Sequence, residues 1–305
     1  MKRCLVTLSL AGCFLLAVPI EACNLTTTLE DERIDVFVDG VLFTSYRFPS
    51  NWKFPYLWPI IGPASGESLT IEEGIGHPHH RSLYLACDQV NGCNFWQEGI
   101  DRGRQVSLGP QVLEQGARVV IQDRCDWVCS GRPSPIRDTR TIIISAPEKC
   151  ARWIECIFDI EFKVDTTILP SNHALFSAEV IPEISVRGGG MLTDSLGGER
   201  EAETFGSRAE WCDYSGNING HDEGLTLYQH PSLCGYPWPF FTRDYGFMSP
   251  TPMYWLPPQG IQFKQGEHIT LRFLVLVHSP GADKPAIEAF YQKWKESEIK
   301  PFSDQ

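Results

Sequence analysis

The chain has 305 residues, of which 42% are hydrophobic and 21% charged, and its formal net charge at pH 7 is −12. These proportions are those of a globular protein with a sizeable core. The acidic balance argues against nucleic acid or an anionic membrane surface as the main partner, because both require a basic footprint. An anionic small molecule held by a local group of Arg and His is compatible with it.

The first 22 residues have the pattern of an export signal. Two basic residues precede an apolar run from Cys4 to Ile20, and Glu21-Ala22 follows it. We expect cleavage after Ala22 and a mature protein outside the cytoplasm, either periplasmic or secreted. A lipoprotein with an anchor on Cys13 is the less favoured alternative. No later segment has the roughly 20 unbroken apolar residues that a membrane span requires.

Short segments rich in β-branched and aromatic residues then recur along the chain. Asp39-Gly40 predicts a hairpin between strands at 34–38 and 41–46. Residues 51–63, dense in aromatics and prolines, are predicted to form an irregular loop. Further strands are expected at 106–113, 117–122, between 127 and 144, and at 151–164, 175–186, 225–228 and 269–277, with one helix at 285–295. This pattern predicts an all-β fold, a large twisted antiparallel β-sandwich with one short C-terminal helix, as a single domain over residues 23–305.

Eight cysteines lie beyond Cys23, and in an exported protein some of them are expected to form disulfides. The sequence leaves the pairing open. Only Cys150 with Cys156 is excluded, because the two residues bracket one strand and would stand roughly 20 Å apart.

Three of the eight histidines, His77, His79 and His80, fall within four positions, and Arg81 follows directly. Core packing does not explain such a run, since a buried imidazole needs hydrogen-bond partners. We therefore expect the segment to line a functional cleft. Its substrate-binding candidates are His77 and Arg81 and, a short distance downstream, Asp88, Asn91, Trp96 and Glu98.

Two kinds of chemistry suit these histidines. If residues 77–80 are extended, His77 and His79 point to one face and His80 to the other. His77 and His79 could then ligate a metal together with a third ligand from elsewhere in the chain. Alternatively, the histidines bind a polyhydroxylated or anionic ligand, and one of them acts as general acid or base. Pro78 cannot donate to a β-ladder, which places the segment at an edge, a bulge or a strand end.

Three later segments hold further candidates. His173 follows Asn172 at the start of a strand-like run and is a candidate catalytic residue. Residues 209–216 place aromatic rings beside a carboxylate and a hydroxyl, a combination that suits a sugar and is also good turn chemistry. The last segment comprises Gln229-His230-Pro231 and then residues 238–246, in which an arginine could clamp a carboxylate or pair with a neighbouring acid. The substrate-binding candidates in these later segments are Trp211, Asp213, Tyr214, His230, Arg243 and Tyr245.

Taken together, these motifs resemble the bacterial family labelled "methane oxygenase PmoA". The resemblance covers roughly residues 50–280 and departs from the family pattern at Cys87, where a histidine is expected. Asn172-His173, with Gly266-Glu267 before a late strand, gives a weaker similarity to aldose 1-epimerase and other galactose mutarotase-like sandwich proteins. That similarity implies a sandwich with a sugar-sized concave face and a general acid at His173. The segments that carry the first resemblance are 77–83, 88–92, 95–96, 172–176, 211–216, 230–231 and 241–246.

We therefore expect an exported carbohydrate-active protein, an enzyme that acts on a sugar or uronic-acid ring. The proton-transferring pair would be His173 with His79 or His80, and epimerisation, elimination and hydrolysis all use such groups. The expected partner is a small molecule or an oligosaccharide.

In this hypothesis Arg81 and Arg243 hold the anionic or hydroxyl-rich part of the ligand, and Trp96 and Trp211 provide stacking surfaces. The alternatives are a glycan-binding protein without catalysis, and a metal-dependent oxidoreductase built on His77 and His79. No cofactor is predicted, and a divalent metal is left open.

Overall fold

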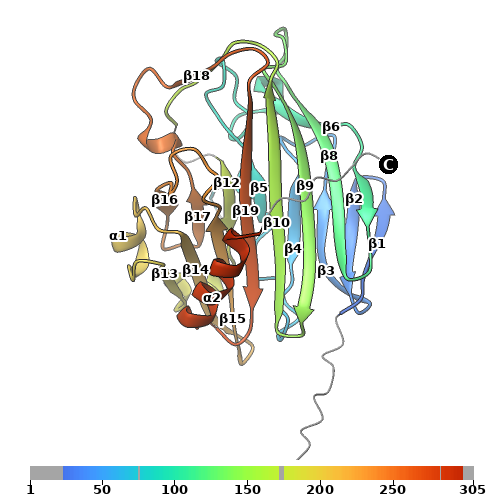
Figure 1. Cartoon of the computed structure of the whole chain (residues 1–305), viewed down its shortest axis with the longest axis vertical. Helices are drawn as coiled ribbons and strands as arrows, with labels where there is room; N and C mark the ends of the chain where they lie inside the picture. The colour runs from blue at the N-terminus through green and yellow to red at the C-terminus, as the bar shows by residue number, and fades with distance from the viewer. Residues whose placement is uncertain (1–22, 75, 172–174, 282, 298–305) are drawn as a thin grey trace, which may run out of the picture.

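The structure is a computed structural model that describes residues 23–74, 76–171, 175–281 and 283–297. Two large antiparallel sheets form its two layers (Figure 1). The eight-stranded sheet has the spatial order β1 (Leu25–Glu30), β2 (Arg33–Val38), β3 (Val41–Arg47), β4 (Tyr56–Ile60), β5 (Leu83–Leu85), β12 (Phe176–Glu179), β17 (Phe247–Pro250) and β16 (Phe240–Thr242).

The second sheet has nine strands. Eight follow in the order β13 (Met191–Asp194), β14 (Trp211–Ile218), β15 (His221–Gln229), β19 (His268–His278), β10 (Ala151–Phe162), β9 (Ile136–Glu148), β8 (Arg118–Val128) and β6 (Arg104–Ser107). The ninth, β7 (Gln111–Glu114), also pairs with β8. A separate two-stranded sheet joins β11 (Thr166–Ile168) to β18 (Ile261–Phe263). The helical segments are α1 (Arg200–Thr204), α2 (Lys284–Lys295) and the 3₁₀ turns η1 (Ile100–Arg102), η2 (Pro182–Ile184), η3 (Val186–Gly188) and η4 (Met253–Trp255).

The core lies between the two layers. In β10 every second residue from Ile154 to Phe162 is buried in the largest apolar cluster, which also contains Val36, Phe43 and Leu83 of the facing sheet. Successive side chains of a strand point to opposite faces, so this alternation is what a sheet with one covered face requires. Each fully buried large apolar side chain stabilises the fold by about 1.5–3 kcal/mol. The predicted all-β sandwich is confirmed.

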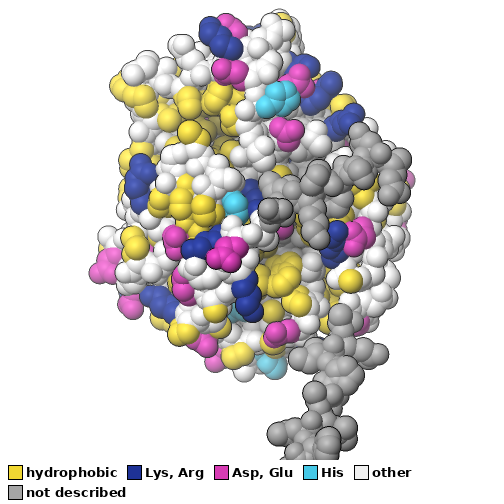
Figure 2. Space-filling view, in the orientation of Figure 1, with side chains coloured by type: hydrophobic (Ala, Val, Ile, Leu, Met, Phe, Trp, Pro, Cys, Tyr) yellow, Lys and Arg dark blue, Asp and Glu magenta, His cyan; other side chains and the backbone are white. Residues whose placement is uncertain are grey.

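Helix α2 covers part of the outer face of the nine-stranded sheet, in front of β14, β15 and β19 (Figure 1). Ile287, Tyr291 and Trp294 are its buried residues, at a spacing of four and then three. That spacing places them on one side of a helix. They pack against Trp211 and Tyr228, among others. The predicted C-terminal helix is confirmed, and Figure 2 shows acidic and basic side chains interspersed over this face of the molecule.

Several predicted elements differ from the structure. The hairpin around Asp39-Gly40 is confirmed, with both residues at the positive φ angles that a tight turn of this kind requires. The predicted loop at 51–63 instead contains β4, where a register shift against β3 accommodates Pro59 within the ladder. The expected strand 106–113 is interrupted after Ser107, because Gly109 turns the chain with φ 106°.

Two more expectations are corrected in the second half of the chain. The strand expected over 175–186 ends at Glu179, because Pro182 begins the first of two 3₁₀ turns. The short helix α1 was not predicted. The export signal lies outside the described residues and stays a prediction, as does the single domain over 23–305. Within the described part of the chain, no helix is long and apolar enough to cross a membrane.

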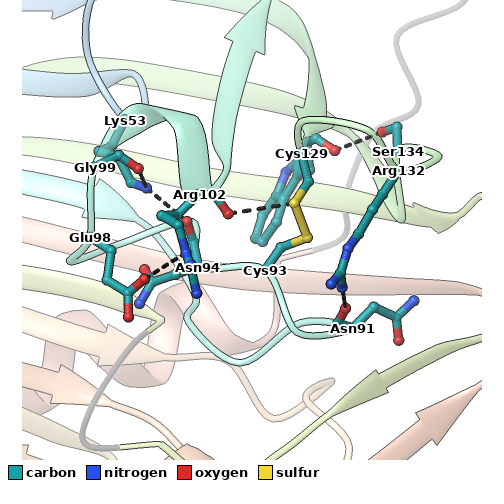
Figure 3. Close-up of a disulfide and its surroundings, with 11 residues drawn as sticks. Lys53, Asn91, Cys93, Asn94, Glu98, Gly99, Arg102, Cys129, Arg132 and Ser134 are labelled. Atoms are coloured by element: carbon teal, nitrogen blue, oxygen red, sulfur yellow. Dashed lines mark hydrogen bonds and ion pairs between the residues drawn. A yellow bond between two sulfur atoms is a disulfide. The ribbon is translucent and has the colours of Figure 1, made fainter.

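A disulfide joins Cys93 to Cys129 at the end of β8, a pairing that the sequence left open (Figure 3). Around it, Lys53 donates to the backbone oxygens of Asn94 and Gly99 at 2.7 and 2.9 Å. The loop that follows β5 is thereby attached to the nine-stranded sheet on one side and to the β3–β4 connection on the other.

Candidate functional site

The histidine segment is a tight turn and not an extended strand. The backbone N–H of His77 donates to Gly74 at 3.0 Å, and that of His80 donates to His77 at 2.9 Å. Glycine is required at position 74, since a Cβ there would lie 2.8 Å from the His77 oxygen and 3.1 Å from a carboxylate oxygen of Glu179. Gly76 has φ 77°, a conformation that side chains disfavour.

This turn gathers all three imidazoles. One potential ligand atom from each of His77, His79 and His80 lies within 4.8 Å of the other two. Extended backbone was the condition under which His80 would point away from the other two, and the turn shows that this condition is not met. His80, the sequence neighbour of His79, is thus the residue that could supply the third ligand that the sequence left unassigned.

Aromatic rings hold the imidazoles in place. The ring of His80 is fully buried and stacks on Trp96 at 5.6 Å and on Phe247 at 4.5 Å. His79 meets the Trp96 ring edge-on at 5.0 Å, and His77 stacks on Tyr245 at 5.3 Å. The Trp96 backbone is fixed in turn by Asn94, whose side-chain oxygen accepts from the Trp96 N–H at 2.8 Å.

Glu179, at the end of β12, makes a short polar contact with the cluster. Its Oε2 lies 2.6 Å from Nδ1 of His80, and the two side chains are 4% and 1% exposed. Burial, and next the charge of His77, lowers the pKa of His80 to about 3. Burial also raises the pKa of Glu179 to about 7, against the opposing charge of His77.

The pKa of His79 is lowered to about 4 by burial and then by the charges of His80 and His77. His79 and His80 are therefore neutral near pH 7. The neutral imidazole is the form that binds metals, and a carboxylate on its second nitrogen fixes the ring orientation.

A hollow of about 300 Å³ adjoins the cluster. His77, Glu179, Arg187 and Tyr245 supply its polar side chains, together with Ser185. Burial raises the pKa of Tyr245, so its hydroxyl stays protonated.

A larger hollow of about 570 Å³ lies beside α2, with Arg272 and Glu155 in its lining. These two residues pair with each other at 2.6 Å, and none of the clustered histidines lines this hollow. The smaller hollow is therefore the better candidate for a site.

Of the residues predicted from the sequence, His77, His79, His80, Trp96 and Tyr245 come together. Two of their sequence neighbours do not join them. The guanidinium of Arg81 lies 3.7 Å over the ring of Trp52 and donates to the backbone oxygen of Glu72 at 3.0 Å. Glu98 is half-exposed and pairs with Arg102 at 2.9 Å (Figure 3).

Asp88 and Asn91 do not line the hollow either. Asp88 is buried, and burial raises its pKa. Asn91 supports a turn, because its side chain accepts from the N–H of Thr167 at 2.8 Å and donates to the Asp165 oxygen at 3.1 Å. His173 lies outside the described residues.

Three candidates from the later segments belong to the outer face of the nine-stranded sheet. Trp211 lies under α2 and donates to Glu288 at 3.0 Å. Asp213 is buried and contacts His278 at 2.8 Å. His230 contacts a guanidinium nitrogen of Arg272 at 2.9 Å, beside Trp294. Each of the three makes its polar contact within the fold, and none of them lines the hollow beside the histidine cluster.

Tyr214 and Arg243 are neighbours of the site without lining its hollow. The Tyr214 hydroxyl donates to the backbone oxygen of Arg243 and lies 3.3 Å from that of Phe247. The Arg243 guanidinium pairs with Glu201 at 3.1 Å and lies 3.9 Å over the ring of Phe241. Both residues support the strand pair that carries Tyr245.

Sequence reasoning missed Glu179 and Arg187. For Glu179 a signal existed, because it is the one acid in the otherwise uncharged, strand-like run 175–182. For Arg187 the signal was weaker, a single cation immediately before Gly188-Gly189-Gly190.

The chain is similar in structure to a candidate aldose 1-epimerase from Escherichia coli K12, with a TM-score of 0.33 and 11% sequence identity. That match covers 84% of this chain and 99% of the other. No curated protein matches the sequence. The resemblance to the PmoA-labelled family stays a prediction. Residues 33–292 match the model of a family described as a family of unknown function (DUF6807), and the chain therefore belongs to that family.

Proposed function

We propose that the protein is a metal-dependent enzyme in which His77, His79 and His80 hold a divalent transition-metal ion. Its substrate is a small oxygen-rich molecule, such as a sugar derivative, bound in the adjoining hollow. The observation that supports this proposal is the convergence of three imidazole ligand atoms within 4.8 Å. Imidazole is a ligand that suits zinc, copper, iron and nickel.

The geometry is close to that of a bound site. With Zn–N bonds of about 2.0–2.1 Å, the nitrogens of a tetrahedral site lie roughly 3.4 Å apart. Because the ligand atoms lie within 4.8 Å of one another, the half-buried rings of His77 and His79 have to approach His80 by up to about 1.4 Å. Glu179 and the aromatic neighbours of His80 hold that ring in position. His77 and His80, stacked at 4.9 Å, have to fan apart.

Three protein ligands leave a coordination position for water or substrate, as catalytic zinc sites do. A bound ion supplies Lewis-acid activation of a substrate oxygen or of a water molecule. The chain contributes the rest. Glu179 fixes the proton on the Nδ1 side of His80, Tyr245 supplies an aromatic wall and a protonated hydroxyl, and Trp96 keeps water from the inner side of the ligands.

The first test is elemental analysis of protein purified without chelator, followed by titration with Zn²⁺ or Co²⁺. We expect about one equivalent of metal per chain, and loss of binding in His79→Ala. The matched control is His268→Ala, since His268 is exposed and lies 3.4 Å from Asp159, apart from the cluster. Equal stoichiometry in the His79→Ala and His268→Ala variants would refute the site.

A second candidate function is acid/base chemistry on a sugar ring without metal. The contact between Glu179 and His80 favours it, because Glu179 also lines the hollow and could exchange a proton with a substrate hydroxyl. A panel of sugars and uronic acids, incubated with chelator-treated protein and followed by mass spectrometry, separates the two functions. Turnover that persists in chelator and is lost in Glu179→Gln would favour the metal-free mechanism.

A further inference from the structure

One of the side chains that line the hollow beside the histidine cluster, the cationic Arg187, has no part in the proposed metal chemistry. Arg187 lies in η3 and lines the hollow together with His77 and Glu179. Its guanidinium carbon is 5.4 Å from the centre of the Tyr245 ring, and His77 stacks on the same ring at 5.3 Å. Arg187 and the histidine cluster therefore face one small space.

Arg187 has no carboxylate partner within ion-pairing distance among the described residues. Three arginines that are less exposed than Arg187 do: Arg140 pairs with Asp138 at 2.7 Å, Arg272 with Glu155 and Arg243 with Glu201. The Arg187 side chain is exposed at the mouth of the hollow and permanently charged. A cation of this kind leaves its guanidinium fork available to a ligand.

The backbone that carries Arg187 is rigid. A Cβ at Gly188 would lie 1.9 Å from the Pro182 oxygen, so only glycine fits there. The Ser185 hydroxyl donates to the same Pro182 oxygen at 2.7 Å and accepts from the Gly188 N–H at 3.2 Å. The arginine is thus presented from a fixed turn, which lowers the entropy cost of using it in binding.

We propose that Arg187 is the anion subsite of this hollow, and that the substrate is a small hydroxylated molecule with an anionic group, a carboxylate or a phosphate. The planar guanidinium matches either group with two parallel hydrogen bonds. The hydroxyl-bearing end of the substrate then lies toward the histidines. This orientation rests on the proposed function, whereas the anion subsite itself does not.

Calorimetric titration tests the subsite with glucuronate, glucose 6-phosphate and glucose as probes. We expect the wild-type protein to prefer one anionic probe over glucose, and Arg187→Gln to weaken that probe about 10- to 100-fold while leaving glucose unchanged. Glucuronate and glucose 6-phosphate distinguish a carboxylate substrate from a phosphate one. Arg124→Gln is the matched control, because Arg124 is an exposed arginine of β8.

Each titration is carried out with metal-loaded and with metal-free protein, and metal content is measured for every variant. A preference for an anionic probe that depends on Arg187 but not on metal supports the subsite even if the metal site fails. If the protein binds metal but has equal affinity for glucose and both anions, the anion subsite is refuted and the metal site is not. Equal losses in Arg187→Gln and Arg124→Gln also overturn it, as does the absence of binding by either anion.

Discussion

Replacing Glu179 with glutamine tests how the fold tunes its histidines. The carboxylate and the His80 imidazole are 2.6 Å apart, with 4% and 1% of their side chains exposed, so solvent screens their interaction little. Glutamine keeps the shape and an acceptor oxygen but removes the negative charge that the carboxylate carries above its pKa of about 7. Losing such an outer contact costs a metal site about 10- to 100-fold in affinity, or about 1.4–2.7 kcal/mol.

The assay is competition for Zn²⁺ between the protein and a chromophoric chelator, followed by absorbance at fixed pH. Glu72→Gln is the control, because Glu72 accepts from Tyr56 at 2.9 Å and from Arg47 at 3.1 Å on a more exposed part of the same side of the sheet. Thermal unfolding of both variants shows that each is folded. An affinity for Zn²⁺ that Glu179→Gln leaves within about twofold of wild type would refute the role given to this contact.

Three further predictions concern the rest of the fold. In Gly74→Ala the new methyl group would lie 2.8 Å from the backbone oxygen of His77. We therefore expect the free energy of unfolding, measured by urea denaturation, to fall by about 1–3 kcal/mol and zinc binding to weaken. Unchanged stability would contradict the tight turn. Burial alone lowers the pKa of His278, but the charge and hydrogen bond of Asp213 outweigh it and raise the pKa overall. This pair therefore stabilises the protein fully below the unfolded-state pKa of about 6.5 and loses its effect as pH rises through the higher folded-state pKa. Urea denaturation at several pH values should show that the free energy of unfolding of the wild type falls over this pH range, and that it falls less in Asp213→Asn. Parallel pH dependences in the two proteins would contradict the stabilising role of the pair. Removing the Cys93–Cys129 disulfide, which has a sequence separation of 36, by Cys93→Ser should cost up to about 4 kcal/mol in the same assay; a negligible change would show that the link constrains little.

The sequence predicted the sheets better than it predicted the site. Alternating apolar residues and the Asp39-Gly40 turn are local signals, and the β2–β3 hairpin and most long strands followed from them. The prediction for β4 was wrong because Pro59 indicated a loop. A register shift between β3 and β4, for which the local sequence gives no signal, accommodates this proline. Strand partners such as β5 and β12, which are distant in sequence, cannot be read from periodicity.

Within the site, the run of histidines was identified and its geometry was not. The alternation of side chains in extended backbone would place His80 on the opposite face from His77 and His79. Gly74 and Gly76 are the residues that instead indicate a turn. Glu179 is 99 residues from His80, so only the folded sheet shows that they meet. Trp211 matched a sugar-binding composition equally well, but in the structure α2 covers it.

The turn at Gly74–His80 has a consequence for the order of assembly. Its three imidazoles are separated by at most three positions, so little chain entropy is lost in bringing them together. In the proposed metal site they would therefore be able to capture an ion before the sheets close. A synthetic peptide spanning residues 74–81 that binds Zn²⁺ weakly but measurably would show this; no binding would mean that the ligands need the finished fold. Glu179 joins only when β12 pairs with β5, so early capture would be loose and the completed sandwich would tighten it.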